Sequence, residues 1–134
     1  MAWTPNRIVA LILGIVLALL GLVGFLVAPT MAKGTVMGFD VDLIQNLVHL
    51  VSGVLAIAAV LMAWPRRYNQ IFGIIFLLLG LAGVFYPALY FNGMLLGLMH
   101  ANATDHILHI LIGIVAIATG FSQTEATVTA TPDL

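Results

Sequence analysis

The hydrophobic pattern of the chain consists of four long apolar stretches separated by polar segments. The stretches cover about residues 8–28, 43–64, 70–87 and 105–121, and Asp105 is the one Asp, Glu, Lys or Arg residue within them. At a helical rise of about 1.5 Å per residue, such stretches reach across most or all of the roughly 30 Å hydrocarbon core of a bilayer. The pattern therefore predicts an all-α membrane protein, a bundle of four spanning helices.

Polar residues and helix breakers between the stretches predict how the helices connect. Asp42 is placed to cap the start of the second helix, because its side chain can accept a hydrogen bond from the first turn. Pro65 ends that helix, and the turn after it is so short that the second and third helices must form an antiparallel pair. The longer connections, at residues 29–42 and 86–104, are expected to be loops. Two residues are candidates to cap the fourth helix: Thr104 and Asp105.

The composition agrees with a membrane protein. Hydrophobic residues make up 63% of the chain and charged residues only 7%, whereas about a quarter of a soluble domain is charged. A net charge of -1 argues against nucleic-acid binding, and the absence of cysteine excludes disulfides, thiolate metal sites and cysteine nucleophiles. A chain of 134 residues is normally one domain. We expect a single transmembrane domain at residues 1–121 and a disordered tail at residues 122–134.

The basic residues predict the orientation of the helices. Arg7, Arg66 and Arg67 fall on one side of the membrane and Lys33 alone on the other. By the positive-inside rule, the side with three arginines is cytoplasmic. Both termini, the tail included, are therefore expected in the cytoplasm. The two long loops are expected on the outer side of the plasma (inner) membrane.

One stretch of the chain occurs twice. Residues 45–58, QNLVHLVSGVLAIA, are matched by residues 105–118, DHILHILIGIVAIA, at an offset of 60 positions. In each copy a polar residue is followed four positions later by a histidine, His49 or His109, and then by a glycine. These glycines are Gly53 and Gly113. Positions four apart share one face of a helix, and small residues let helix backbones approach closely, so both histidines are expected to face a neighbouring helix.

The first and third helices also match, at an offset of 59 positions. The matched glycines are Gly14 with Gly73, Gly21 with Gly80, and Gly24 with Gly83. Two matches in the same order predict an internal duplication of a two-helix hairpin, with one repeat at residues 7–64 and the other at residues 69–121. Two such hairpins would be related by an axis along the membrane normal. All eight glycines, these six together with Gly53 and Gly113, are expected to line helix–helix contacts.

Several of these motifs together resemble a known family. They are the glycine pattern of Gly14, Gly21 and Gly24, NLVHLVSG at residues 46–53, RRY at residues 66–68 and DHILHILIG at residues 105–113. Over roughly residues 7–121 the chain is similar to the bacterial four-helix membrane proteins grouped as domain of unknown function 4383. The resemblance implies four helices and Asn at the position where this chain has His106, but it implies no activity. It also implies importance for four residues: Asn46, His49, Asp105 and His109.

The histidines suggest two kinds of ligand site. His49 and His109, at equal depth in the two repeats, could ligate a haem axially or bind a metal or the magnesium of a chlorin. His106, Asp105 and His100 could form a divalent-metal site near the outer surface. The alternative is that the histidines are structural and hydrogen-bond to polar neighbours, with Gln45 or Asn46 beside His49 and Asp105 beside His109. Such interhelical bonds contribute about 0.6–2 kcal/mol each.

Transport and catalysis are less well supported. The first and third helices hold no charged residue, so no relay of polar groups crosses the membrane. Ser52 lies one turn from His49 but has no acid nearby to orient a catalytic base. The pattern therefore favours a structural or interaction subunit in the bilayer, self-associated or part of a larger membrane complex, and not an enzyme. A subunit that binds haem, pigment or metal through the two histidines is the alternative.

Overall fold

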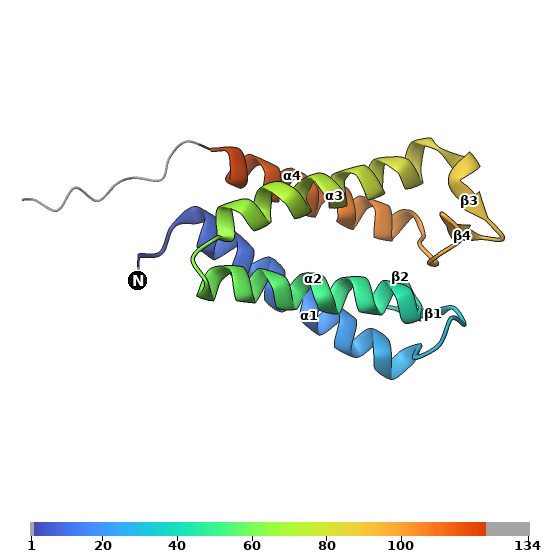
Figure 1. The fold of residues 1–134 in the computed structure, drawn as a ribbon. Coiled ribbons are helices and arrows are strands. Elements are labelled where there is room, and N and C mark those ends of the chain that lie inside the picture. The colour runs from blue at the N-terminus through green and yellow to red at the C-terminus, as the bar shows by residue number, and fades with distance from the viewer. Residues whose placement is uncertain (1, 123–134) are drawn as a thin grey trace, which may run out of the picture.

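The computed structural model describes residues 2–122, and four α-helices account for most of them. These are α1 (Pro5–Val27), α2 (Leu43–Leu61), α3 (Pro65–Phe85) and α4 (Ala103–Phe121). Each is long and apolar enough to cross a membrane. The helices pack as two hairpins, α1 with α2 and α3 with α4 (Figure 1). The predicted four-helix bundle is thus confirmed, while the tail expected at residues 122–134 lies, from residue 123 on, outside the described residues.

The connection between the hairpins is shorter than the sequence suggested. Helix α3 begins at Pro65, five residues before the expected start at residue 70. Proline suits the first helical position, because the N–H that it lacks would have no partner there. The end of α2 is closed by Ala63, which adopts a left-handed φ of 62°, and by a hydrogen bond of 2.9 Å from the Trp64 N–H to the Ala59 carbonyl. Arg66 and Arg67 therefore belong to the first turn of α3.

Within each hairpin, glycines bring the two helices together. A Cβ added at Gly14 would lie 3.1 Å from the carbonyl oxygen of Gly53, and one added at Gly73 would lie 2.9 Å from the amide nitrogen of Ile117. The structure places all eight glycines named above against the other helix of their own hairpin. At six of them the neighbouring atoms include backbone, so a larger side chain would force the helices apart.

The two long connections are more regular than loops. The first contains strands β1 (Gly34–Val36) and β2 (Phe39–Val41). The second contains a short helix, η1 (Pro87–Leu89), and strands β3 (Tyr90–Phe91) and β4 (Met94–Leu95). Each strand pair turns through two residues of positive φ, Met37–Gly38 and Asn92–Gly93. The pair Asn92–Gly93 is a strong sequence signal for a hairpin turn. It lies in a largely apolar segment, for which a loop was expected.

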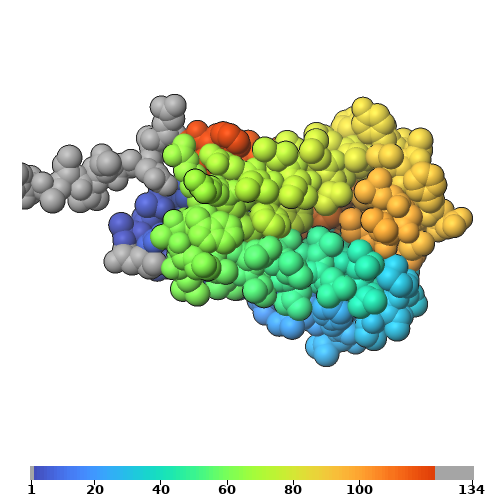
Figure 2. Space-filling model, viewed as in Figure 1, coloured from blue at the N-terminus to red at the C-terminus, as the bar shows by residue number. Residues whose placement is uncertain are grey.

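Both loop regions lie at the same end of the bundle, opposite the N-terminus (Figure 1). In the space-filling view they adjoin, the first in cyan and the second in yellow to orange (Figure 2). The centre of the bundle is apolar, with Leu17, Phe76 and Ile112 packed together from three helices. A further apolar cluster, Leu95, Met99 and Ala101, is formed by residues of the second loop itself. Most of the buried polar residues gather beside it, at the loop end.

Candidate functional site

A group of polar side chains fills the loop end of the bundle, and we call it the loop-end polar cluster. It consists of Asp40, Asp42, Gln45, Asn46, His49, Tyr90, His100, Asn102, Asp105, His106 and His109. Eight of them are buried, and none of these eight exposes more than 7% of its surface. The cluster therefore lies inside the protein, where each polar group needs a partner.

Asp105 is the centre of the loop-end polar cluster. Its Oδ1 accepts a hydrogen bond of 3.0 Å from Nε2 of Gln45. Its Oδ2 accepts from the backbone N–H groups of Asp40, at 3.0 Å, and Asn102, at 2.8 Å. Gln45 and Asp105 occupy matching positions in the two copies of the repeated stretch, 60 residues apart. One buried carboxylate thus joins the two hairpins through α2 and β2.

The N-cap residues of α2 and α4 make a second link between the hairpins. Asp42 caps α2 as expected, with Oδ1 accepting from the Gln45 N–H at 2.9 Å. Its Oδ2 accepts from the N–H of His100 at 2.6 Å and pairs with the His100 ring at 2.9 Å. Asn102 caps α4, in a capping box with Asp105, and its Nδ2 donates to the Gly38 carbonyl at 2.9 Å. Each cap therefore also holds the loop of the opposite hairpin.

The cap of α4 differs from the two sequence candidates. Thr104 and Asp105 lie inside the first turn of the helix, and the Asn102 side chain accepts from the N–H groups of both. Asp105 is instead the third residue of the capping box, where its side chain reaches back to the N–H of Asn102. This arrangement turns the Asp105 side chain toward the first hairpin.

His49 of α2 and His109 of α4 lie against each other in the core. Their ring centroids are 5.9 Å apart with the ring planes at 71°, and the Phe76 ring of α3 lies 5.4 Å from that of His109. Within residues 2–122, none of the four ring nitrogens has a hydrogen-bond partner, nor does Oε1 of Gln45. The expected bonds from Asp105 or Gln45 to the histidines are not made, because those side chains bind each other and the backbone. The alternative partner of His49, Asn46, binds the Ala28 carbonyl instead.

His106 and Asn46 cover matching glycines on the other helix of their hairpins. The ring of His106 lies over Gly83, and the side chain of Asn46 lies over Gly24. Asn46 anchors its position by donating to the Ala28 carbonyl at 2.8 Å. His106 is hydrogen-bonded through Nε2 to the hydroxyl of Tyr90. The histidine thus stands where the resemblance implied Asn and fills the same kind of position as Asn46.

The hydrogen bonds of Tyr90 define the tautomer of His106. The Tyr90 hydroxyl donates to the Ala101 carbonyl at 3.0 Å, so its oxygen must accept from Nε2–H of His106. Burial and the nearby carboxylates of Asp105 and Asp40 raise the pKa of the Tyr90 phenol, which keeps it protonated as a donor.

The three residues predicted to bind a divalent metal do not converge. His100 pairs with Asp42, His106 pairs with Tyr90, and the Asp105 carboxylate is occupied by three N–H donors. Across residues 2–122, no three His, Asp or Glu side chains are arranged to hold a metal ion. The chemistry of the loop-end polar cluster is therefore mainly that of a network of internal hydrogen bonds. Its largest unpaired groups are the rings of His49 and His109, in which neither nitrogen has a partner within residues 2–122.

A smaller polar contact at the opposite end of the bundle was missed by the sequence analysis. Nδ2 of Asn69 donates to Oδ1 of Asn6 at 2.9 Å and to the Asn6 carbonyl at 3.1 Å. Both residues are buried, and the contact joins α1 to α3. The available signal was an asparagine in the first two turns of the first helix of each hairpin, next to a long apolar stretch. The Arg66 side chain nearby donates to the Gly120 carbonyl, so it fastens α3 to the end of α4.

Comparison with known proteins agrees with the resemblance seen in the sequence. A family described as a domain of unknown function, number 4383, matches residues 7–122. No curated protein and no solved structure matches the chain.

Proposed function

The chain belongs to the family of domain of unknown function 4383, and from this premise we propose that it is a multi-pass protein of the plasma membrane with a structural or interaction role. The family description supplies no activity, so the proposal depends on the site. Four helices of spanning length and an apolar surface support the membrane location. The protein would act as a scaffold or as a small subunit, associated with further copies of itself or with a larger membrane complex.

The single observation that carries this role is that hydrogen bonds from the protein itself occupy both oxygens of the Asp105 carboxylate. A catalytic carboxylate has to be presented to a substrate, usually in a cleft. Asp105 is 1% exposed, and both of its oxygens accept hydrogen bonds from the protein itself. Such a carboxylate holds the two hairpins in one arrangement and leaves little capacity for chemistry.

The distribution of charge supports a cytoplasmic position for both termini. Arg7, Arg66 and Arg67 lie at the end of the bundle away from the loops, and Lys33 lies in the first loop. Among residues 2–122, every acidic residue is at the loop end. Single cysteines at Arg67 and at Lys33 test this, because the chain has no native cysteine. A membrane-impermeant maleimide should label position 33 from outside and position 67 only after the cells are opened.

Equivalent contacts in the two hairpins support an internal duplication. Gly14 lies against Ala56, and Gly73 lies against Ala116. The next glycines of the series, Gly21 and Gly80, likewise meet residues that are matched in the repeat, Leu50 and Ile110. We infer that residues 7–64 and 69–121 are two copies of one ancestral hairpin.

The interaction role is tested by photo-crosslinking in the intact membrane. A photoreactive amino acid is placed at exposed positions on the outer faces of the helices, such as Leu19 and Leu111. The proposal expects discrete protein adducts, either to a second copy or to a partner, from at least one face. Adducts to lipid alone from every face, with a monomer of 14.3 kDa as the sole protein species, would contradict it.

The unpaired nitrogens of His49 and His109 favour one second candidate, a subunit that binds haem, pigment or metal. Buried polar atoms without partners cost about 1–3 kcal/mol each, and a ligand would remove that cost. An absorption spectrum and a metal analysis of the purified protein separate the two functions. A Soret band, a chlorin band or stoichiometric metal that disappears in His49→Gln and His109→Gln would support this candidate. A colourless, metal-free protein supports the structural role.

A further inference from the structure

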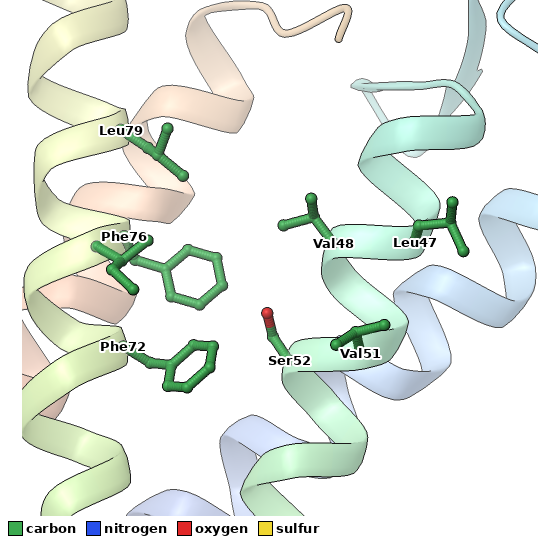
Figure 3. Close-up of a pocket in the computed structure, with 8 residues that line it drawn as sticks. Leu47, Val48, Val51, Ser52, Phe72, Phe76 and Leu79 are labelled. Carbon is green, nitrogen blue, oxygen red and sulfur yellow. The ribbon is translucent and has the colours of Figure 1, made fainter. Parts of the chain in front are cut away.

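A groove runs between α2 and α3, halfway along the bundle (Figure 3). Its cavity volume is about 320 Å³. One wall comes from α2 and the other from α3, and the side chains of Phe72 and Phe76 extend from α3 toward Val48 and Ser52 of α2 (Figure 3). The lining residues are Leu47, Val48, Val51, Ser52, Phe72, Ile75, Phe76 and Leu79. Ser52 is the one polar residue among them.

The groove opens sideways, on the outer surface of the bundle. Phe76, at its floor, is 2% exposed, whereas the rim residues Leu47, Val51 and Ile75 are 41–52% exposed. Phe72 packs into the apolar cluster around Tyr68 at one end of the groove. Leu79 packs against the apolar cluster of the second loop at the other end. The opening therefore faces whatever surrounds the helices.

Neither water nor another helix suits this groove. Its walls offer a single hydroxyl, whereas a bound water needs two to four polar partners. A helix with its side chains is about 10–12 Å across, and close helix packing in membranes depends on small residues. The groove contains no glycine or alanine, and the glycines of all four helices are already used inside the hairpins. A narrow apolar occupant remains.

The depth of the groove indicates the class of that occupant. Its residues on α3 run from Phe72 to Leu79, which is the middle of a helix that spans Pro65–Phe85. In a helix that crosses a bilayer of about 30 Å, this level is where the ends of lipid chains from the two leaflets meet. Branched and aromatic walls also match a hydrocarbon chain, because dispersion contacts with the chain replace those lost in a void.

We propose that the groove between α2 and α3 binds the terminal part of a hydrocarbon chain of a membrane lipid. The proposal rests on the membrane location given above, and it adds a specific binding site to an otherwise unspecific lipid surface. The lipid chain packs on Phe72 and Phe76 and fills the space between the two hairpins. Because the groove lies between hairpins, its occupant also bridges them.

Photo-labelling in a bilayer tests the proposal. The protein is reconstituted in phosphatidylcholine vesicles that contain a phosphatidylcholine with a diazirine near the methyl end of one acyl chain. Adducts are mapped by mass spectrometry. We expect groove residues to be labelled at least fivefold more than Leu19 of α1, which is 56% exposed. Equal labelling of the groove and of Leu19 would overturn the proposal.

Matched variants show whether the groove itself is responsible. Val51→Trp fills the groove from the α2 wall, and Ile75→Trp fills it from the α3 wall, in case one variant does not fold. Val54→Trp is the control, because Val54 is on the same helix and is as exposed as Val51 but does not line the groove. The fivefold preference should fall to about one in the filling variants and remain in the control.

Two further outcomes separate the possible failures. If Val51→Cys forms a disulfide between copies, a second copy of the chain covers the groove and the lipid proposal is wrong. If all four helices remain unlabelled and the maleimide experiment also fails, the membrane location is at fault. Labelled helices without a groove preference refute the lipid site alone.

Discussion

Within each hairpin the helices meet backbone to backbone, whereas the two hairpins meet through side chains. Inside the first hairpin Gly53 lies against the backbone of Gly14 and Ala18. Between hairpins the contacts are polar at both ends, through Asp105 and Asn69, and apolar in the middle around Phe76. The glycine contacts tolerate almost no change in spacing, while the side-chain contacts leave a groove. The glycine contacts thus fix the spacing of the helices within each hairpin, while the contacts between hairpins lie at separate points with a groove between them.

The largest effect is expected from widening a hairpin. Gly113→Leu places a large side chain against the backbone of Leu77, where an added Cβ would already lie 2.6 Å from the amide nitrogen. We expect the free energy of unfolding to fall by about 3 kcal/mol, the upper end of usual overpacking costs. Thermal unfolding in detergent measures this. The control is Ile114→Leu at the neighbouring exposed position, and an equal midpoint for both variants would contradict the backbone contact.

The next effect concerns the interface between hairpins. Asp105→Asn keeps the shape of the side chain but removes the charge, and it turns an amide donor toward N–H groups that need acceptors. We expect a loss of about 2 kcal/mol. Asp40→Asn is the matched control, because the Asp40 carboxylate pairs with half-exposed Lys33 at 3.2 Å, and such pairs contribute less than about 1 kcal/mol.

Chemical unfolding of the two variants provides the measurement, and limited proteolysis of the connection at residues 62–64 adds a readout for the interface. Asp105→Asn should increase cleavage there, because the hairpins separate before either one unfolds. If cleavage rises equally in Asp40→Asn, the carboxylate of Asp105 is not the link between the hairpins.

A smaller effect is expected at His106, which covers Gly83 and is bound by Tyr90. Tyr90→Phe removes the hydroxyl that binds His106 and the Ala101 carbonyl, so we expect a loss of about 1 kcal/mol. His106→Asn restores the residue type of Asn46 over Gly83 and should lose a similar amount. The double variant should lose less than the sum, and this coupling is obtained from a double-mutant cycle. Strict additivity would mean that Tyr90 and His106 act independently.

The smallest effect is expected at the histidine pair. His109→Leu keeps a similar volume and removes two ring nitrogens that have no partner within residues 2–122. The free energy of unfolding should not fall and should rise by about 1 kcal/mol, because the variant removes the cost of burying ring nitrogens without partners. His109→Gln serves as the polar comparison. A large loss in both variants would show that the ring holds a ligand or a water.

Much of the architecture could be predicted from the sequence because it depends on local patterns. Apolar stretches of spanning length predict helices, and the repeated glycines indicate which faces carry small residues. Asp42 was identified as a cap because capping depends on residues within one turn. Errors arose where two local signals competed, as at Pro65, which can end one helix or begin the next, and at Asn92–Gly93, where an apolar segment contains a hairpin turn.

The partners within the loop-end polar cluster could not be predicted in this way. Helical periodicity indicates that Gln45, His49, Asp105 and His109 face inward, but it does not say which polar groups meet. Asp105 could have bound His109, one turn away on its own helix, yet it binds Gln45 across the interface and two backbone N–H groups. The choice depends on how the caps and loops of both hairpins orient the carboxylate.

The sequence by itself determined the elements of this protein: four helices long and apolar enough to span a membrane, glycines on the helix faces that make contacts, and membership of the family. These follow from composition and from spacings of three to four residues, which act within a helix or between adjacent helices. Only the tertiary structure decided that Asp105 joins the hairpins, that His49 and His109 lie together without partners, and that a groove remains between α2 and α3. Those features depend on how the two hairpins pack on each other, which brings together residues as far apart in the chain as Gln45 and Asp105. A periodic pattern within one helix does not specify such contacts.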